Sequence, residues 1–576
     1  MNRFARFLPF LRWFPLSGET VRADFMAGIT VALVLIPQSM AYAQLAGMPA
    51  YYGLYAAFLP VAVAVMWGSS HQLGTGPVAV VSLLTASSLA VFAAPGSPDF
   101  IALAIMLALL VGVIQLLLGV FKLGVIVNFL SHPVIVGFTN AAAIIIGLSQ
   151  VSKLFGVPMG RSEHFINDII GVFKQVGHTH LPTLAMGILA IALMWGVKRY
   201  RPKWPGVLIA VAVTTTLSWG LGFAQSLGGQ VVGSIPQGLP SLALPALDMT
   251  KLGSLLSAAL VISLVGFMEA ISIAKALAAK TKQRLDPNQE LIGQGLSNII
   301  GSLTQAFPVS GSFSRSAVNM GAGARTGMSS VFTAIFVLIT LLFLTPLLYH
   351  LPQAVLAAVI IMAVIGLVNV KAVIHAWHAQ KHDGIAAGVT FAATLAFAPH
   401  LDNGIMIGAG LALVLYLLRT MKPRVAILGR FPDGTLRDIK VNPGLPTSEH
   451  IVAMRFDGQL YFANVAFFED TVLEAVADHP KAKYLLIVGD GINQLDASGE
   501  EVVHHLVKRL RGIGVELVFS GLKKQVLDIM RSTHLFDLIG QRNLFPTEDK
   551  AITAIYERLG DEAAEDLFCP VRQTAQ

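Results

Sequence analysis

The stretch Phe307-Pro308-Val309-Ser310-Gly311-Ser312-Phe313-Ser314-Arg315-Ser316 decides how this chain folds. Apolar segments flank it at 291–306 and 331–348, so we expect it to lie at membrane depth, where an unpartnered charge is costly. Pro308 lacks an amide donor, and the glycine and serines loosen the backbone, which predicts a broken span followed by a fresh helix start. Such a start exposes free amides and a positive dipole end, and with Arg315 it is suited to hold an anion.

The composition of the 576 residues is that of a membrane protein. Hydrophobic residues make up 55% of the chain and charged residues only 13%, whereas a soluble domain carries about 25% charged residues. We attribute the net charge of +7 to cytoplasmic loops rather than to nucleic-acid binding. The single cysteine, Cys569, excludes an internal disulfide framework. The absence of Walker, His-Glu-x-x-His and Cys-x-x-Cys motifs argues against an enzyme, an ATP-driven pump or a cofactor.

Fourteen apolar segments predict a polytopic α-helical membrane protein. We place them at 25–45, 51–67, 77–92, 100–119, 125–150, 181–198, 205–223, 253–277, 287–303, 312–320, 328–348, 353–369, 384–399 and 402–419. The segments 77–92 and 312–320 are too short for a bilayer core, which needs about 20 helical residues. Both follow breaks, the first of which is Gly74-Thr75-Gly76-Pro77. Half-helices in corresponding places of two seven-span halves predict an inverted repeat with a binding site between them.

The loop charges predict that both termini lie in the cytoplasm, and we expect the membrane to be a bacterial-type inner membrane. Basic residues follow nearly every second span, as the positive-inside rule expects. They are Lys122, Lys198, Arg199, Arg201, Lys203, Lys280, Lys282, Arg284, Arg325, Lys371, Lys381, Arg419, Lys422 and Arg424. Residues 1–23 carry arginines among Phe, Leu and Trp, which indicates an amphipathic segment at the lipid surface rather than a signal peptide.

The composition changes after Arg424. We expect a transmembrane transport domain at 24–424, a Gly- and Pro-rich linker at 425–448, a small soluble domain at 449–562 and a tail at 563–576. β-rich runs at 450–456, 484–488 and 515–519 alternate with helical periodicity at 464–477, 499–512, 522–534 and 548–558. This alternation predicts an α/β domain with parallel strands and helical crossovers.

Several motifs carry a family resemblance. They are Ala50-Tyr51-Tyr52-Gly53-Leu54-Tyr55-Ala56-Ala57, Trp67-Gly68-Ser69-Ser70-His71 and Gly74-Thr75-Gly76-Pro77-Val78-Ala79-Val80-Val81-Ser82. Together they resemble the signature of the sulfate permease (SulP) family, with His71 where Lys or Arg is usual. Ile36-Pro37-Gln38-Ser39-Met40-Ala41-Tyr42-Ala43 resembles the first span of that family and Ser312–Ser316 its tenth. Asp496-Ala497-Ser498-Gly499 resembles the strand-to-helix loop of a STAS domain.

The resemblance implies core and gate domains in a 7+7 inverted repeat, an anion substrate, a homodimer and an elevator-like motion. It also implies that the C-terminal domain is a STAS domain, with Ser498 at the position phosphorylated in bacterial STAS proteins and with a possible soluble partner. The alternative for Ser498, which we favour, is a helix N-cap. Gln38 and Tyr42 are placed beside the substrate by the resemblance; the alternative for both is core packing.

The two half-helix starts are expected to face each other near the midplane. Amides at Val78 and Ala79, and at Phe313 and Ser314, can then donate to an oxyanion beside Arg315, as can the Ser314 hydroxyl. The alternative is that Arg315 pairs with a carboxylate or with backbone carbonyls.

Glu269 lies in the apolar run Val265-Gly266-Phe267-Met268-Glu269-Ala270-Ile271. A carboxylate in such surroundings is readily protonated, which makes Glu269 a candidate proton carrier; the alternative is a fixed counter-ion of Arg315. His375, His378 and His382 have helix-like spacing, but beside Trp377 and Lys381 they indicate an interfacial helix, and we expect no metal site.

The sequence therefore predicts secondary active transport of a small anion, with a proton, or else sodium, as the coupling ion. Sulfate, bicarbonate and C4-dicarboxylates all suit a site built from helix dipoles and an arginine. Two alternatives stay open: a nucleobase transporter of the same fold type, and a membrane-anchored sensor that signals through the STAS domain.

Overall fold

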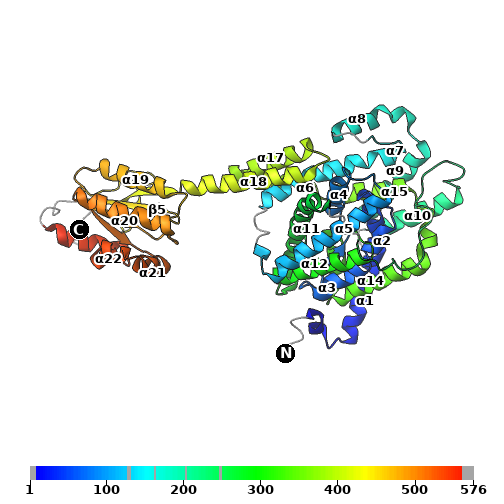
Figure 1. Ribbon diagram of the computed structural model, residues 1–576, viewed down its shortest axis with the longest axis horizontal. Helices are drawn as coiled ribbons and strands as arrows, with labels where there is room; N and C mark the ends of the chain where they lie inside the picture. Colours follow the sequence, from blue (N-terminus) through cyan, green and yellow to red (C-terminus); the bar gives the residue numbers. More distant parts are fainter. Residues whose placement is uncertain (1–7, 126–130, 161–163, 202–203, 246–249, 561–576) are drawn as a thin grey trace. The chain divides into compact units, whose positions relative to one another are not determined.

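The computed structural model describes all residues except 1–7, 126–130, 161–163, 202–203, 246–249 and 561–576. The chain divides into two compact units, Met1–Ala412 and Leu413–Gln576. The first unit is almost entirely helical, and the second contains a sheet covered by helices (Figure 1). The expected tail at 563–576, with Cys569, lies outside the described residues.

The first half of the helical unit runs from a short 3-10 helix to α10. Its elements are η2 (Pro9–Trp13), α1 (Gly18–Leu45), α2 (Tyr52–Ala56), α3 (Leu59–Trp67), β1 (Gly74–Gly76), α4 (Ala79–Leu89), α5 (Pro98–Val120), α6 (His132–Ser149), α7 (Val151–Phe155), α8 (Phe165–Lys174), η4 (Val176–His178), α9 (Leu181–Tyr200) and α10 (Gly206–Gly220). Helix α1 begins at Gly18, capped by Ser17, so the first span starts seven residues earlier than the apolar pattern indicated.

The second half repeats this order, with a short strand and a short helix in the corresponding place. Its elements are α11 (Leu252–Thr281), α12 (Pro287–Leu303), β2 (Ser310–Ser312), α13 (Phe313–Gly321), α14 (Met328–Ile339), the π-helical turn η5 (Thr340–Leu344), η6 (Thr345–Leu348), α15 (Gln353–Ile365), α16 (Val370–Ala379), α17 (Lys381–Ala396) and α18 (Leu401–Met421). Each of the fourteen expected apolar segments carries a helix. Eight helices in the described residues are long and apolar enough to cross a membrane, and three shorter apolar helices accompany them.

The helices of this unit form two bundles. In one, α5 packs against α12 and α11, α3 packs against α12, and α1 packs against α14 and α13. In the other, α6 packs against α17 and α15, and α9 packs against α10 and α15. The bundles meet where α1 contacts α15 and α10, and where α4 contacts α6. These bundles have the composition expected of the core and gate domains, because each draws helices from both halves of the chain.

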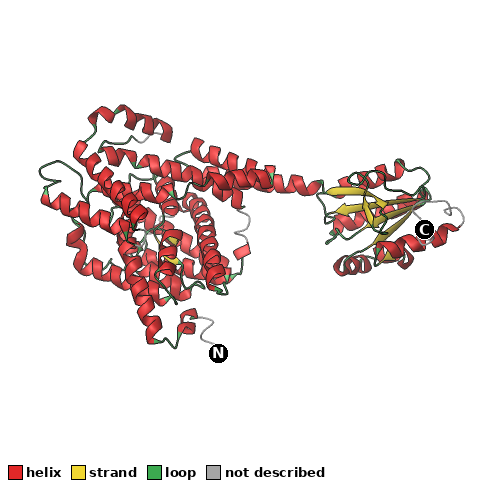
Figure 2. Cartoon of the chain, turned by 180° about the vertical axis from the view of Figure 1, so that it is seen from behind, coloured by secondary structure: helices red, strands yellow, loops and turns green. Residues whose placement is uncertain are grey.

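The C-terminal unit is a six-stranded sheet in the order β4-β3-β5-β6-β7-β8 (Figure 2). Strands β5 to β8 are parallel, whereas β3 is antiparallel to both of its neighbours. The strands are β3 (Arg424–Arg430), β4 (Leu436–Asp438), β5 (Ile451–Asp457), β6 (Tyr484–Val488), β7 (Glu516–Ser520) and β8 (Leu544–Phe545). The helices are α19 (Val465–Ala477), α20 (Ala497–Gly512), α21 (Lys524–Ser532), α22 (Leu535–Ile539), η7 (Gln541–Asn543) and α23 (Glu548–Leu559). One face of the sheet packs on α19 to α22 and the other on α23.

The segment 425–448 is therefore not a plain linker. It contains β3 and β4, and Val425 to Ile427 pair with residues of β5. The glycines and prolines that indicated a linker lie largely between and after these strands, for example Gly434 in its left-handed turn at φ +86°.

Candidate functional site

The two short strands form a two-stranded sheet inside the helical unit. β1 and β2 pair antiparallel, with Gly74 opposite Ser312, Thr75 opposite Gly311 and Gly76 opposite Ser310. Figure 2 shows strand segments enclosed by the surrounding helices. Because α4 follows β1 and α13 follows β2, this pairing brings two helix starts from distant parts of the chain to one place.

The first helix start offers free backbone amides. Val78 is the N-cap of α4 and makes no side-chain cap, and the first helical hydrogen bond runs from Ser82 N to Val78 O. The amides of Ala79 and Val80 therefore precede the helical ladder. The helix begins at Ala79 and not at Pro77, so Val80 joins Ala79 as a donor that the sequence pattern did not single out.

The second helix start combines free amides with the arginine. The Ser312 side chain caps α13 and accepts a hydrogen bond from Arg315 N at 3.5 Å, which leaves the amides of Phe313 and Ser314 for another acceptor. The Phe313 side chain is 64% exposed, and Ser314 is exposed as well. Ser316 ties the start to β1, because its hydroxyl accepts from Gly74 N at 2.8 Å and donates to Ser312 O at 2.6 Å.

The guanidinium of Arg315 is buried without a protein partner. The residue is 1% exposed, and Nε, Nη1 and Nη2 have no hydrogen-bond partner among the described residues. It lies against β1: a Cβ added at Gly74 would be 3.1 Å from Arg315 Cβ, and one at Gly76 would be 3.3 Å from Nη2. The structural alternative, in which Arg315 pairs with a carboxylate or with carbonyls, is wrong for this structure. A buried and unpaired cation costs stability, which an incoming anion would offset.

Helix α1 supplies two further side chains to this place. Gln38 and Tyr42 are buried one helical turn apart, and α1 contacts both α4 and α13. Tyr42 lies close enough to Arg315 for an electrostatic interaction. Gln38 Oε1 has no hydrogen-bond partner in the described part of the chain. Helix α1 thus contacts both short helices, and Tyr42 interacts with Arg315, whereas Gln38 is a buried residue of the same helix one turn away.

Glu269 is a neighbour of the same site. Helix α11 passes β2 at Gly266, whose carbonyl accepts a hydrogen bond from Ser310 Oγ at 2.6 Å. Glu269 follows less than one turn later, is half-buried and interacts electrostatically with Arg315 and Tyr42. No ion pair joins Glu269 to Arg315 within the described residues. The carboxylate is therefore near the arginine without neutralising it by direct contact.

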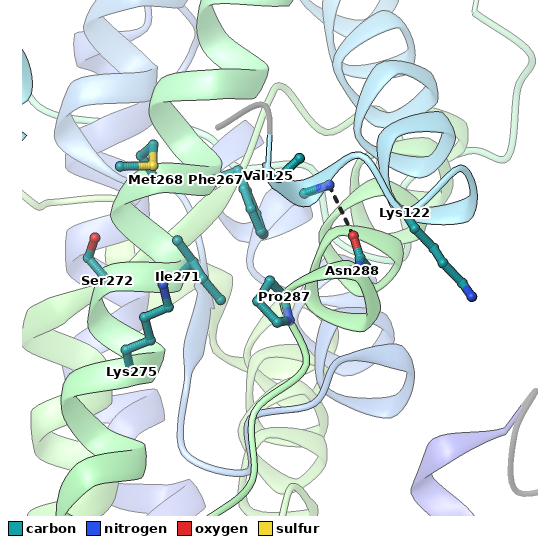
Figure 3. A pocket seen from close by; sticks show the side chains of 10 residues that line it. Lys122, Val125, Phe267, Met268, Ile271, Ser272, Lys275, Pro287 and Asn288 are labelled. Atoms are coloured by element: carbon teal, nitrogen blue, oxygen red, sulfur yellow. Dashed lines mark hydrogen bonds between the residues drawn. The ribbon is translucent and has the colours of Figure 1, made fainter. Parts of the chain in front are cut away.

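Two cavities in this unit are lined by other residues. One, of about 300 Å³, is lined by Lys122 beyond α5, by Met268 and Lys275 on α11 and by Asn288 on α12, which accepts from Gly124 N at 3.0 Å (Figure 3). A second, of about 1560 Å³, lies between the ends of α1 and α4 and the second bundle, where Lys153 lines it. Arg315 lines neither cavity.

Ser498 lies in the other unit and is not the N-cap of its helix. Asp496 caps α20: its Oδ1 accepts from Gly499 N at 2.8 Å and its Oδ2 from Phe462 N at 2.9 Å. A carboxylate two residues earlier thus takes the role that we expected of the Ser498 hydroxyl. Ser498 is the second residue of the helix.

Comparison with protein families and curated proteins gives a consistent result. The model described as Sulfate permease family matches residues 21–390, and that described as STAS domain matches residues 442–551. The protein named "Sulfate transporter 4.1, chloroplastic" from Arabidopsis thaliana is 36% identical, over 97% of this chain and 83% of that relative. "High affinity sulfate transporter 2" from Stylosanthes hamata is 33% identical, over 92% of this chain and 83% of that relative.

Solved structures share the fold. The murine Solute Carrier 26 family member A9 anion transporter in the inward-facing state superposes with a TM-score of 0.89 at 24% identity, over 97% of this chain and 96% of that chain. The transmembrane domain of the cyanobacterium bicarbonate transporter BicA gives a TM-score of 0.58 at 20% identity, over 69% of this chain and 98% of that chain. The predicted fold class, a multi-pass helical transporter followed by a STAS domain, is confirmed.

Proposed function

Because this chain belongs to the sulfate permease family, we propose that it is a secondary active transporter of a small oxyanion, with sulfate as the first candidate. The names of the two curated relatives supply the candidate, since both are called sulfate transporters. Bicarbonate and C4-dicarboxylates remain the other members of the proposed substrate class. The protein is a multi-pass membrane protein of a transporter family, and not an enzyme.

The unpartnered guanidinium of Arg315 is the observation that carries this proposal. Beside it are the amides of Ala79 and Val80 from one helix start and those of Phe313 and Ser314 from the other. Each donor set comes with the positive end of a helix dipole. An oxyanion with several acceptor oxygens can accept from both starts and from the guanidinium at once, whereas a neutral nucleobase would leave the cation unpaired.

We propose Glu269 as the proton carrier. Its carboxylate senses the charge of Arg315 but does not pair with it, so it can take up a proton when an anion neutralises the arginine. In this scheme the anion and the proton bind together and release together. Sodium in place of the proton is the alternative coupling ion.

The proposed motion moves the first bundle past the second. Gln38, Arg315 and Glu269 all belong to the bundle of α1 to α5 and α11 to α14, so this bundle would carry the anion as one body in an elevator-like step. From the loop charges we propose that both termini face the cytoplasm. From the family resemblance we also propose a homodimer, in a bacterial-type inner membrane. The STAS domain is the proposed place for a soluble partner, with Ser498 as a candidate modification site.

Uptake by proteoliposomes tests the proposal. Purified full-length protein is reconstituted, loaded with unlabelled sulfate and offered labelled sulfate, bicarbonate, succinate or uracil, with and without an inward proton gradient. We expect saturable counterflow of sulfate or another member of the anion class. Accumulation of uracil alone would favour a nucleobase transporter, and no saturable flux of any of the four would favour the sensor.

A further inference from the structure

Helix α12 carries a row of buried polar residues on one face, and three of them hydrogen-bond to β1 or to the segments that precede β1 and β2. Glu290, Gln294 and Asn298 follow one another at four-residue spacing, which places them on the same side of the helix. They are 2%, 1% and 1% exposed. We call them the α12 column. Polar side chains are costly at such depth unless they hydrogen-bond, so their partners indicate what they are for.

Asn298 holds the chain at the entrance to β2. Its Oδ1 accepts from Val309 N at 2.8 Å, and its Nδ2 donates to Val309 O at 3.1 Å. The amide therefore satisfies both backbone groups of the residue just before β2, as a neighbouring strand would. Gln115 of α5 fixes the Asn298 side chain from behind, because its Oε1 accepts from Nδ2 at 3.1 Å.

Gln294 holds the other strand. Its Nε2 donates to Thr75 Oγ1 at 2.8 Å. Thr75 is the central residue of β1 and pairs with Gly311 of β2. Helix α12 therefore hydrogen-bonds to β1 through Gln294 and to the residue before β2 through Asn298.

Glu290 holds the loop that leads into β1. Its Oε2 accepts from Ser69 N at 2.8 Å, from Ser70 N at 3.1 Å and from Ser69 Oγ at 3.1 Å. A Cβ at Gly68 would lie 3.2 Å from both carboxylate oxygens. The loop can therefore approach the carboxylate this closely because residue 68 is glycine.

The helix behind the column has little freedom to shift. A Cβ at Gly293 would lie 2.7 Å from Ala64 O and from the backbone of Gly68, and one at Gly295 would lie 2.5 Å from Leu116 N. α12 is thus in backbone contact with α3 on one side and with α5 on the other. Because these contacts are close-packed, α12 cannot easily move, and it fixes the positions of β1 and β2.

We infer that the α12 column sets the geometry of the anion site, with Gln294 and Asn298 as positioning residues that act on Arg315 through β1 and β2. Arg315 stands against Gly74 and Gly76 of β1 while its helix continues directly from β2. A small slip between the strands would therefore move the guanidinium relative to the amides at the start of α4. This inference rests on the proposed function, because it assigns positioning residues to the same site.

A double-mutant cycle between α12 and β1 tests the inference. Gln294→Met and Thr75→Val are made singly and together in the full-length chain, and sulfate affinity is measured by calorimetry. Each single change is expected to weaken binding by roughly fivefold or more, and the double variant by no more than either single one, because both remove the same hydrogen bond. Ser302→Ala is the matched control. The buried Ser302 hydroxyl lies on the same helix but donates only to Ile299 O of α12 itself, so the sulfate affinity of this variant should equal that of the wild type.

A second readout separates positioning from a general loss of stability and from failure of the proposed function. Hydrogen exchange of peptides that contain β1 and β2 is measured without sulfate in the same variants. Faster exchange there, with unchanged exchange in α9 and α10, supports the inference even if the wild-type chain binds no sulfate, a result that would count against the proposed function alone. Unchanged exchange in β1 and β2 with unchanged affinity, or effects on affinity that multiply in the double variant, would overturn it.

Discussion

Replacement of Gly76 by alanine probes how closely β1 is fitted to Arg315. Gly76 has a φ of +144°, in a region that L-residues with a side chain rarely adopt. The new Cβ would lie 3.3 Å from Arg315 Nη2 and 3.6 Å from Leu35 Cδ1. Alanine therefore imposes a backbone penalty and pushes on the guanidinium at the same time.

The two effects are of similar size but have different readouts. A residue held in such a backbone region costs about 1–3 kcal/mol of stability. Loss of one hydrogen bond between the guanidinium and a bound anion costs about 1.5–3 kcal/mol. Since 1.4 kcal/mol is about tenfold in affinity, Gly76→Ala should weaken sulfate binding by roughly tenfold to a hundredfold.

Gly238→Ala is the matched control. Gly238 also has a positive φ, of +110°, but a Cβ there would meet nothing within 4 Å. Calorimetric titration and thermal denaturation of both variants should show a similar loss of stability and a loss of affinity in Gly76→Ala alone. Equal affinities in the two variants would refute the placement of Arg315 Nη2 at the anion.

Three further outcomes are expected. Glu269→Gln, which mimics the protonated state, should abolish accumulation driven by a proton gradient while sulfate exchange persists; accumulation that still follows the gradient would remove Glu269 from the coupling step. Asp24→Asn should destabilise the chain by about 1–3 kcal/mol in denaturation experiments, because this fully buried carboxylate accepts from Arg325 N at 2.7 Å and from Thr326 N at 3.1 Å; an unchanged midpoint would contradict this. Burial raises the pKa of Glu548 at the start of α23 above its unfolded value, so its ionisation lowers stability as the pH rises between those two values. Glu548→Gln should therefore raise the melting temperature at neutral pH and have no effect below about pH 4; a lower melting temperature at neutral pH would show that the sign is wrong.

The broken spans could be predicted from sequence because their signals are local. Proline and glycine before residues 79 and 313 interrupt an apolar pattern. An arginine within a membrane span is costly, so its presence there indicates a function. These features predicted that Arg315, Ala79 and Ser314 lie close together, and the pairing of β1 with β2 places the two helix starts side by side. They did not reveal that Val80 also offers a free amide, because the helix start depends on turn geometry and lies at Ala79 rather than at Pro77.

The pairing of β1 with β2 and its register could not be predicted from the sequence. Gly74 and Ser312 are paired although hundreds of residues separate them, and a three-residue strand carries no recognisable alternation. The α12 column was also hidden. Its residues lie in a segment that the sequence indicates only as an apolar span. The positioning role of Gln294 and Asn298 can be inferred only once their partners Thr75 and Val309 are known from the structure.

In the STAS domain the parallel strands were predictable and the first two strands were not. β5, β6 and β7 are runs of buried apolar residues, which is the usual pattern of parallel strands covered on both faces. β3 and β4 are separated by the turn at Gly434 and followed by Pro443 and Pro446, so their composition resembled a linker. Asp496 replaced Ser498 as the cap because its side chain reaches Gly499 N three residues on.

Arg315 is a buried cation without a protein partner, and the proposed function requires that an anion neutralises it. Thermal denaturation of Arg315→Met and wild-type protein, each with and without saturating sulfate, tests this requirement. Without sulfate the variant should be at least as stable as the wild type, because it removes a buried charge that has no partner. With sulfate only the wild type should gain stability. A variant that is strongly destabilised without sulfate, or that is stabilised by sulfate as much as the wild type, would contradict the account.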